Sequence, residues 1–447
     1  MSRVPVPDPW PAPVSPGPLD ATVAIPGSKS LTNRHLLVAA LARDPVEVVA
    51  PLDSRDSRLM QRALTGLGSG ITESTRDGSP VWTVSPLPLG PEAGSDPVSI
   101  DTGLAGTVMR FVPVLAALQR RPVTFDGDAA ARRRPVGPVL QALRALGAHV
   151  DGGEEGFLPF TVTGNEAVVG GEVSIDASGS SQFVSALLLA APLLPHGLTL
   201  RHTGSSLPSP QHIGMSLDVL RAAGITASAA PDHRSWRVEP GVPSPGRVVV
   251  EPDLSNAGPF LGAALICGGS VRIPHWPATT TQIGALWEEL LPRMGARVQR
   301  LPDGSLQVSG DGGIAGGEFA DTGELAPTLA ALCALADGPS RLTGIAHLRG
   351  HETDRLAALV AELARVGIQA RELEDGLEIT PGAATAHGAV WESYEDHRMA
   401  TAGAMVGLRI PGVSVRDVAT TSKTMPDFVH MWERMLATAG TPTGDVA

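Results

Sequence analysis

Two basic and two small polar residues gather at the start of one expected helix. The run PGSKSLTNRHLLVAALA, residues 26–42, passes from a Pro-Gly turn into an apolar helical pattern whose first turn holds Lys29, Ser30, Asn33 and Arg34. A helix start carries unpaired N–H groups and partial positive charge, so it attracts anions. Together with the Lys and the Arg, this helix start predicts a binding site for a phosphate or a carboxylate.

Lysine is almost absent from the chain, because only two of its 34 basic residues are lysines, Lys29 and Lys423. A lysine ammonium is a compact, strongly hydrated charge that the planar fork of arginine does not mimic. We therefore predict that these two positions require lysine. The formal net charge of −12 argues against nucleic acid as the main partner.

Polar residues recur wherever a short expected strand gives way to an alanine-rich helix. In chain order these groups are Lys29 and Ser30; Gly106, Thr107 and Arg110; Ser180, Ser181 and Gln182; Ser255 and Asn256; Glu324; and Asp396, His397 and Arg398. Binding sites in α/β folds favour such strand-to-helix turns, so we expect six helix starts to face one anion-attracting cleft between two domains.

The residues of these turns divide into two kinds. Ser255, Asn256 and Asp101 are interpreted as N-cap residues, which satisfy the free N–H groups of a helix. A cation near a helix start opposes the helix dipole and destabilises it unless an anion lies between them. Lys29, Arg110 and Arg398 are therefore predicted to be ligand-binding residues.

The chain also contains a long internal repeat. Amphipathic helices of the type LxxLRxLGA end at glycines spaced 71 to 79 residues apart, at Gly68, Gly147, Gly224, Gly295, Gly367 and Gly440. Short strands and an alanine-rich helix lie between successive copies. This alternation predicts an α/β protein made of six βαβαββ units.

Six units form two groups of three, with the Pro/Gly-rich run at 240–246 as the expected linker between them. We place one domain at 28–247 and the other at 15–27 plus 248–447. The proline-rich residues 1–14 are expected to be a disordered lead-in without the layout of a signal peptide. The two cysteines, Cys267 and Cys333, lie in apolar stretches and are expected to be buried free thiols, as suits the cytoplasm.

Seven ordered motifs carry a family resemblance that covers nearly the whole chain: PGSKSLTNR, DTGLAGTVMRF, RRRPVG, SGSSQF, RGHETDRL, EDHRMA and TSKTMPDF. The chain resembles the 5-enolpyruvylshikimate-3-phosphate synthases. The resemblance implies a two-domain inside-out α/β barrel with three βαβαββ repeats per domain. It also implies transfer of the enolpyruvyl group of phosphoenolpyruvate to the 5-hydroxyl of shikimate 3-phosphate, with release of phosphate and without a metal or an organic cofactor.

Positions that match the family motifs imply individual roles. Shikimate 3-phosphate would be bound by Lys29, Ser30, Arg34, Ser180, Ser181, Gln182, Ser209, Glu324, His347 and His351. Phosphoenolpyruvate would be bound by Lys29, Gly106, Arg134, Gln182, Arg355, Arg398 and Lys423. The catalytic residues would be Lys29, Glu324 and Glu352, with Glu352 moving the proton of the enol methylene carbon and Glu324 activating the 5-hydroxyl. The alternatives are an i,i+3 partner of Arg355 for Glu352 and a helix-capping role for Glu324.

The chain departs from the family pattern at four positions. His351 and His347 replace a common lysine and a common asparagine, Leu104 replaces an asparagine, and His212 stands where tyrosine is frequent. The charge of a histidine near neutral pH depends on its surroundings, so His351 is expected to donate to phosphate and to shift the use of shikimate 3-phosphate toward a more acidic pH.

Two other functions remain as alternatives. The sister enzymes that add enolpyruvate to UDP-N-acetylglucosamine carry a reactive loop cysteine, and this chain has no cysteine between residues 119 and 134. A non-catalytic anion-binding relative would not need Lys29, Glu324, Glu352 and Lys423 together. The family further implies a cytoplasmic monomer, no membrane or nucleic-acid partner, and some sensitivity to glyphosate.

Overall fold

The computed structural model describes residues 6–15, 17–350, 352–382 and 384–439. The chain divides into two compact units, Gly27–Glu251 and Met1–Pro26 with Pro252–Ala447. The sequence placed the second boundary at 247/248, and the structure moves it to 251/252. The expected linker at 240–246 therefore lies within the first of these units.

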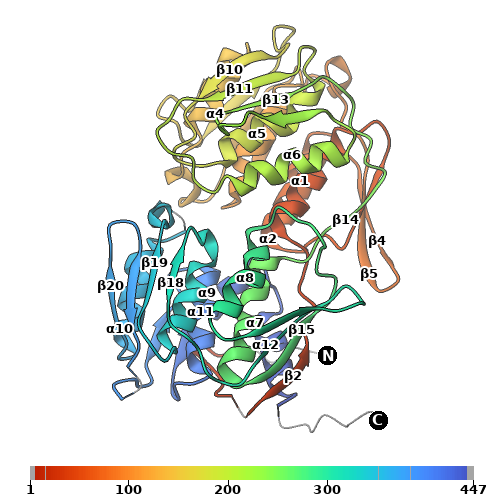
Figure 1. Cartoon of the computed structure of the whole chain (residues 1–447). Coiled ribbons are helices and arrows are strands. Elements are labelled where there is room, and N and C mark those ends of the chain that lie inside the picture. Colours follow the sequence, from red (N-terminus) through yellow and green to blue (C-terminus); the bar gives the residue numbers. More distant parts are fainter. Residues whose placement is uncertain (1–5, 16, 351, 383, 440–447) are drawn as a thin grey trace. The chain divides into compact units, whose positions relative to one another are not determined.

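Between residues 27 and 251 the described chain forms three four-stranded sheets (Figure 1). In spatial order their strands are β14 (Arg247–Val249), β3 (Val46–Val49), β5 (Ser79–Val84) and β4 (Ile71–Arg76); β6 (Val98–Asp101), β7 (Val123–Asp126), β9 (Phe160–Thr163) and β8 (His149–Gly152); and β10 (Gly171–Ile175), β11 (Leu198–His202), β13 (Ser235–Val238) and β12 (Ala227–Ala229). The helices of this unit are α1 (Lys29–Ala40), α2 (Arg55–Gly66), α3 (Gly106–Ala116), α4 (Gly137–Ala145), α5 (Gln182–Ala190) and α6 (Gln211–Ala222).

The other unit repeats the plan with two four-stranded sheets and one three-stranded sheet among its described residues. Their strands are β16 (Arg297–Arg300), β17 (Leu306–Gly310), β15 (Gly269–Ile273) and β2 (Leu19–Thr22); β18 (Glu318–Ala320), β19 (Ser340–Thr343), β21 (Leu377–Thr380) and β20 (Gln369–Glu372); and β1 (Trp10–Pro11), β23 (Ser414–Arg416) and β22 (Val390–Glu392). Its helices are α7 (Leu254–Cys267), α8 (Trp287–Arg293), α9 (Ala326–Ala334), α10 (Arg355–Arg365), α11 (His397–Gly407) and α12 (Phe428–Leu436).

Every four-stranded sheet has the same topology, one parallel pair followed by two antiparallel pairings. In three of these sheets a single α-helix makes the crossover within the parallel pair, as parallel strands require: α3 between β6 and β7, α5 between β10 and β11, and α9 between β18 and β19. Apart from a few polar residues near their starts, these helices are apolar on all sides, and in α3 every residue is buried. A helix without a polar face must lie inside a core. The βαβαββ repeat is thus confirmed in five of the six predicted units, while the sixth, among its described residues, ends with α12 and has β1 in its sheet instead of two further strands.

Two strands are exchanged between the ends of the repeats. β14 pairs in parallel with β3, so the strand expected to open the fourth repeat completes the first sheet instead. β2 pairs in parallel with β15, so the chain before Lys29 supplies the opening strand of the fourth repeat. The sequence could not settle this crossover, because both strands have the same apolar pattern and only long-range pairing separates them.

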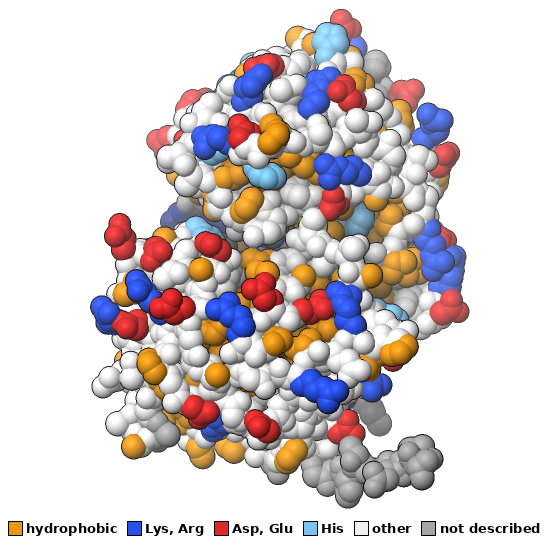
Figure 2. Space-filling model, viewed as in Figure 1, with side chains coloured by type: hydrophobic (Ala, Val, Ile, Leu, Met, Phe, Trp, Pro, Cys, Tyr) orange, Lys and Arg blue, Asp and Glu red, His pale blue; other side chains and the backbone are white. Residues whose placement is uncertain are grey.

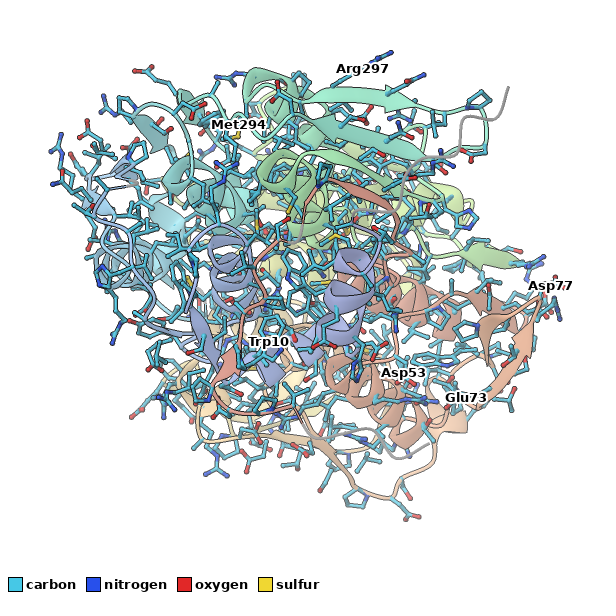
Figure 3. All side chains as sticks on the ribbon, turned by 90° about the horizontal axis from the view of Figure 1, so that it is seen from below. Trp10, Asp53, Glu73, Asp77, Met294 and Arg297 are labelled. Carbon is cyan, nitrogen blue, oxygen red and sulfur yellow. The ribbon has the colours of Figure 1, made fainter. Side chains whose placement is uncertain are left out.

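Residues 6–14 do not fit the disordered lead-in that the sequence predicted. β1 pairs antiparallel with β23, with Trp10 opposite Val415. The Trp10 side chain is 3% exposed, and its ring lies 6.4 Å from the Phe428 ring in an edge-on arrangement. Burial of one large aromatic ring offsets the conformational entropy that is lost when this segment is ordered. The proline-rich composition had suggested that this entropy cost would keep the segment disordered. Figure 3 shows Trp10 within the ribbon of this unit.

Five of the repeat glycines end their helices as expected, with φ between 81° and 102° at Gly68, Gly147, Gly224, Gly295 and Gly367. A side chain is strained in that region, which explains glycine at the stop. Gly440 lies outside the described residues.

A charge cluster holds the β4–β5 hairpin against α2. Arg58 donates to Asp53 at 2.7 Å and to Glu73, while its guanidinium lies 4.8 Å from the centre of the Trp82 ring. Asp53 and Glu73, which both pair with Arg58, are labelled in Figure 3. On the face drawn in Figure 2, acidic and basic side chains alternate and no extended basic patch is present.

The cysteine predictions are only half correct. Cys333 is buried and free, and burial raises the pKa of its thiol to about 12. Cys267 is also free but only partly buried, so the expectation of full burial is wrong for that residue. Among the described residues, no helix is long and apolar enough to cross a membrane.

His35 in α1 is expected to make stability depend on pH. Burial, and then the charge of Arg34, lowers the pKa of His35 to about 4, against about 6.5 in an unfolded chain. Between these values the unfolded state binds a proton that the folded state does not, so the free energy of unfolding falls as the pH falls from about 6.5 toward 4. Urea unfolding at pH 7.5 and 5.0 should show a smaller loss for His35→Leu than for the parent chain. Equal losses in both proteins would contradict this.

Candidate functional site

The start of α1 holds the first group of predicted ligands. Ser28 caps the helix by accepting the N–H of Leu31. Lys29 follows, and its Nζ lies 3.3 Å from Oδ2 of Asp56 in the first turn of α2. The Lys29 side chain is 20% exposed and that of Asp56 is 7% exposed. The ammonium is thus held by one carboxylate and remains accessible to a second anion.

Arg34, one turn later, is surrounded by protein acceptors. Its guanidinium donates to Ser216 Oγ at 2.8 Å, to the Ser30 carbonyl at 2.9 Å and to the His212 carbonyl at 3.0 Å. The residue is 1% exposed, and burial lowers its pKa to about 9. These bonds tie α1 to the start of α6. The predicted contact of Arg34 with a ligand carboxylate stays a prediction, since the described donors meet protein oxygens.

Three side chains meet around Gly106 at the start of α3. Arg110 donates to Oε1 of Gln182 at 2.7 Å and to the carbonyl of Pro135, and Arg134 donates to the carbonyl of Leu104 at 2.9 Å. A Cβ atom placed on Gly106 would lie 3.0 Å from Arg134 Nη2 and 3.2 Å from Gln182 Oε1. Gly106, Arg134 and Gln182, predicted together as phosphoenolpyruvate ligands, do share one location in this unit.

The predicted phosphate-binding serines lie in two neighbouring loops. Ser180 and Ser181 precede α5, and Ser180 Oγ accepts the N–H of Gln182 at 3.2 Å. Ser209 precedes α6 and has a φ of 47°. β10 and β11 lead into these loops and are paired in parallel, so both loops begin at the carboxyl ends of neighbouring strands.

In the other unit, Glu352 joins two predicted phosphoenolpyruvate ligands. Its carboxylate accepts a hydrogen bond from Lys423 Nζ and lies 3.0 Å from Nη2 of Arg355. Lys423 ends the 3₁₀ segment Val418–Lys423, whereas Arg355 begins α10. The i,i+3 partnership of Glu352 with Arg355 is therefore real, and it coexists with the Lys423 contact.

Arg355 also forms a buried ion pair with Asp396. Its Nε lies 2.7 Å from Oδ2 of Asp396, and the two side chains are 2% and 0% exposed. Burial would lower the pKa of Arg355, but the charges of Asp396 and Glu352 outweigh burial and raise it above its usual range. Asp396 in addition caps α11 by accepting the N–H of Arg398. One buried carboxylate thus fixes the backbone of Arg398 and the guanidinium of Arg355.

Glu324 bridges the remaining predicted residues of this unit. Its Oε1 lies 2.7 Å from Ser255 Oγ and 3.0 Å from Nη2 of Arg398. The capping alternative for Glu324 is not supported, because the carboxylate contacts side chains of α7 and α11. Burial and the charge of Arg355 lower the pKa of His347, so that imidazole is neutral at pH 7. His351 lies outside the described residues.

The N-cap interpretations need correction. Asp253 caps α7 by accepting the N–H of Asn256, so neither Ser255 nor Asn256 has that role. Asp101 accepts the N–H of Gly103 and lies before α3, whose capping residue is Ala105. α7 therefore begins at Leu254, before both of its predicted caps, whereas α3 begins only at Gly106, after a longer loop than the sequence pattern suggested.

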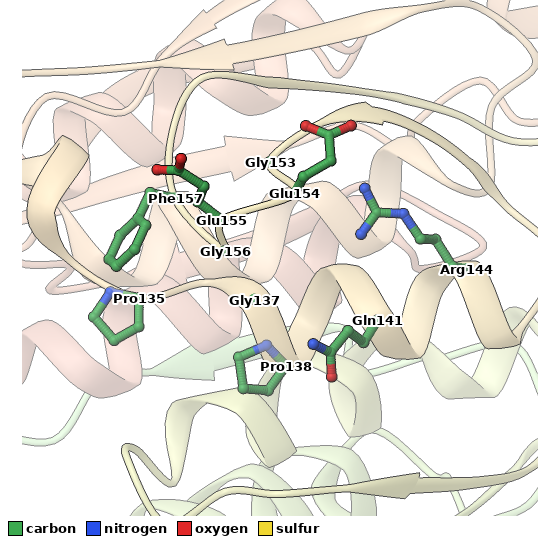
Figure 4. A pocket seen from close by; sticks show the side chains of 10 residues that line it. All are labelled: Pro135, Gly137, Pro138, Gln141, Arg144, Gly153, Glu154, Glu155, Gly156 and Phe157. Carbon is green, nitrogen blue, oxygen red and sulfur yellow. The ribbon is translucent and has the colours of Figure 1, made fainter.

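A shallow pocket of about 250 Å³ lies beside the Arg134 segment, around Pro135 and the first turn of α4 (Figure 4). Arg144, Glu154 and Glu155 line it together with Gln141 and Phe157. None of its lining residues is a predicted ligand. Its first member, Pro135, has a carbonyl that accepts two bonds from Arg110, so the pocket wall supports the Gly106 cluster.

The model of the EPSP synthase family, 3-phosphoshikimate 1-carboxyvinyltransferase, matches residues 14–432. The chain belongs to the EPSP synthase family. A 3-phosphoshikimate 1-carboxyvinyltransferase of Kocuria rhizophila is 56% identical over 439 residues, which are 97% of this chain and 98% of that protein. One of Bifidobacterium longum is 52% identical over 438 residues, which are 96% and 98% of the two chains.

Two solved structures support the family fold. EPSP synthase from Acinetobacter baumannii has a TM-score of 0.77 at 24% identity and covers 94% of this chain and 97% of its own. The enolpyruvyl transferase NikO from Streptomyces tendae has a TM-score of 0.69 at 18% identity and covers 94% of this chain and 96% of its own. The predicted fold, a two-domain α/β barrel of βαβαββ repeats, is confirmed.

Sequence reasoning missed two carboxylates at this EPSP synthase site. Asp56 pairs with Lys29 and Asp396 pairs with Arg355. The sequence identified Asp396 only as part of a strand-to-helix turn. Nothing in its neighbourhood along the chain indicates that its partner is Arg355 in α10. Asp56 lies in the first turn of α2, where an acidic residue is interpreted as a helix-dipole partner, so its contact with Lys29 left no separate signal in the sequence.

Gly106→Ala is expected to weaken phosphoenolpyruvate binding. The added methyl group would press on the ends of Arg134, Gln182 and Arg110, the last at 3.4 Å, so these side chains would shift while the fold remains. Overpacking of this kind costs about 1–3 kcal/mol, which corresponds to a KM for phosphoenolpyruvate raised about 5- to 150-fold. Steady-state kinetics would measure it, with Gly338→Ala as control because no atom lies within 4 Å of that added Cβ. Equal KM values in both variants would refute the crowding.

Proposed function

We propose that the chain transfers the enolpyruvyl group of phosphoenolpyruvate to the 5-hydroxyl of shikimate 3-phosphate and releases phosphate. The observation that carries this proposal is the near full-length identity of 56% to a 3-phosphoshikimate 1-carboxyvinyltransferase. The side chains agree with it, since cations and hydroxyls gather at helix starts in both units. Such groups suit substrates that carry phosphate and carboxylate.

Phosphoenolpyruvate is assigned to the cations of both residue groups. Arg134, beside Gly106, supplies one guanidinium, and Arg355, Arg398 and Lys423 supply further charges. In the described structure the last three already contact Glu352, Glu324 or Asp396. An incoming phosphate would share these cations with the carboxylates, so the carboxylates stay close to the reacting atoms. Lys29, held by Asp56, would contact oxygens of both substrates.

Shikimate 3-phosphate is assigned to the hydroxyl groups. Ser180, Ser181 and Ser209 would donate to its 3-phosphate from neighbouring loops, while Ser30 and Arg34 would meet its carboxylate. Gln182, which accepts from Arg110, would bridge to the second substrate. His347 would contribute a neutral donor, because its lowered pKa excludes a full positive charge at pH 7. His351 keeps its predicted role as a phosphate contact.

The reaction has two halves, an addition and an elimination, and protons move in both. A proton is added to the methylene carbon of phosphoenolpyruvate while the 5-hydroxyl oxygen bonds to C2 and loses its own proton. We assign the first to Glu352 and the second to Glu324, which Arg398 and Ser255 orient. In the second half, Glu352 takes a methyl proton back, the double bond re-forms and the C–O bond to phosphate breaks, while the proton held by Glu324 leaves with the phosphate. Lys29 and Lys423 stabilise the negative charge that collects on the departing phosphate.

The substrates are small molecules, as the family requires. We further propose that the chain acts as a monomer in the cytoplasm, without a nucleic-acid or membrane partner. Glyphosate is expected to compete at the phosphoenolpyruvate positions around Gly106.

Phosphate release tests the proposal. The purified chain is mixed with phosphoenolpyruvate and either shikimate 3-phosphate or UDP-N-acetylglucosamine, and inorganic phosphate is followed over time. We expect catalytic phosphate release in the mixture that contains shikimate 3-phosphate and none in the mixture that contains UDP-N-acetylglucosamine. Release only with the nucleotide sugar would assign the chain to the sister reaction, and release with neither would indicate a non-catalytic binding protein.

A further inference from the structure

His202 lies at the point where the two predicted phosphate-binding loops leave their sheet. It is the last residue of β11, and its Cα partner in the parallel pair is Ile175, the last residue of β10. The loop after β10 leads to Ser180 and Ser181, and the loop after β11 leads to Ser209. His202 is 5% exposed, and the mechanism above gives it no role.

The imidazole of His202 is hydrogen-bonded to both loops. Nδ1 accepts the N–H of Ala177 at 3.2 Å, and Nε2 lies 3.0 Å from the carbonyl oxygen of Ser206. A backbone N–H is always a donor, so Nδ1 is unprotonated, and a carbonyl is always an acceptor, so Nε2 carries the hydrogen. Only the neutral Nε2–H tautomer makes both bonds.

Other contacts draw the same two loops together. Thr203 N–H donates to the Ile175 carbonyl at 2.9 Å. A Cβ atom on Gly204 would lie 2.0 Å from Ser178 Oγ and 2.2 Å from Asp176 Oδ1, so the loops approach closely enough to admit only glycine there. Arg234, from the turn before β13, donates to the Gly204 carbonyl.

We propose that His202 is a positioning residue for shikimate 3-phosphate, with its imidazole fixing the spacing between the loop of Ser180 and Ser181 and the loop of Ser209. The assignment rests on the proposed function and on the serine roles given there. Hydroxyl donors on separate loops bind one phosphate tightly only if their separation is set before the ligand arrives. A bridge between loop backbones sets that separation without contact between the histidine and the ligand.

Three variants of the full chain test the bridge. His202→Leu keeps the volume and removes both hydrogen bonds, and the expected result is a Kd for shikimate 3-phosphate raised roughly 5- to 20-fold. The KM for phosphoenolpyruvate should change less than two-fold, because the side chain of Gln182, the member of the Gly106 cluster next to this loop pair, is held independently by Arg110. His202→Asn places an oxygen near the Nδ1 position, where it can accept the Ala177 N–H, and should recover part of the affinity. Leu200→Ala on the same strand is the control, because Leu200 is 0% exposed and its truncation destabilises the core without removing a bond between the loops.

Calorimetric binding of shikimate 3-phosphate without phosphoenolpyruvate gives the readout, with thermal unfolding measured in parallel. A Kd within two-fold of the parent in His202→Leu, or an equal loss in Leu200→Ala or in His202→Asn, would overturn the positioning role. A parent chain that neither binds shikimate 3-phosphate nor releases phosphate would instead overturn the proposed function, and this assignment with it.

Discussion

Glu352→Gln is expected to lower kcat by about a hundred- to ten-thousand-fold, the usual contribution of a positioned general acid and base. Glutamine has the size of glutamate, and its single amide oxygen can still accept from one of the two cations, Lys423 or Arg355, that contact separate oxygens of the native carboxylate. It cannot carry the proton to the methylene carbon. The loss should therefore appear in kcat, while the KM for phosphoenolpyruvate changes little. Stopped-time assays of phosphate release over the first turnovers would measure it.

Glu378→Gln is the matched control for that variant. Glu378 also pairs with an arginine, Arg371, but on an exposed strand surface of the same unit, with side chains 36% and 70% exposed. Its kcat should equal that of the parent chain. A Glu352→Gln enzyme that keeps more than a tenth of the parental kcat would remove Glu352 from the proton-transfer steps.

Arg355→Met is expected to have the largest effect on stability. Arg355 and Asp396 are 2% and 0% exposed, so the substitution would leave a buried carboxylate without its counter-charge. Breaking a buried pair from one side costs about 3–5 kcal/mol in free energy of unfolding. Urea unfolding would show the loss, and the KM for phosphoenolpyruvate should rise as well, because one predicted ligand is gone.

The double variant Arg355→Met with Asp396→Asn separates the two effects. It removes both charges of the buried pair, and the Asn oxygen can still accept the Arg398 N–H, so part of the lost stability should return while phosphoenolpyruvate binding stays weak. Arg371→Met, which breaks an exposed pair, should cost no more than about 1 kcal/mol. If Arg355→Met costs as little as Arg371→Met, the buried pair does not stabilise the fold as described.

The repeat and the fold class could be predicted from the sequence because both depend on local signals. Glycine stops such as Gly147 and largely apolar helices such as α3 recur at regular spacing, and each is set by the residues of one element. The exchange of β2 and β14 could not be predicted, because it depends on which distant strand offers a free edge. The order of residues 6–15 was missed because Trp10 is stabilised by Phe428, more than four hundred positions away.

The candidate site shows the same division. The cations and hydroxyls at helix starts could be named from the sequence, since a helix start and a polar residue are both visible there. Their partners could not, because Asp56 reaches Lys29 from a different helix and Asp396 reaches Arg355 from α11. His202 had no signal at all, since a histidine at the end of a strand is ordinary until its two ring nitrogens are seen to face two loops.

The central claim is that residues of both units act on one pair of substrates. A crystal structure of the chain with shikimate 3-phosphate and a phosphoenolpyruvate analogue tests it most directly. The account predicts both ligands in one site. Lys29 and Ser180 should contact shikimate 3-phosphate, Arg134 and Lys423 should contact the analogue, and the Glu352 carboxylate should lie next to the carbon of the analogue that corresponds to the methylene carbon. Ligands bound to the residues of one unit alone, with Glu352 out of reach of either, would contradict it.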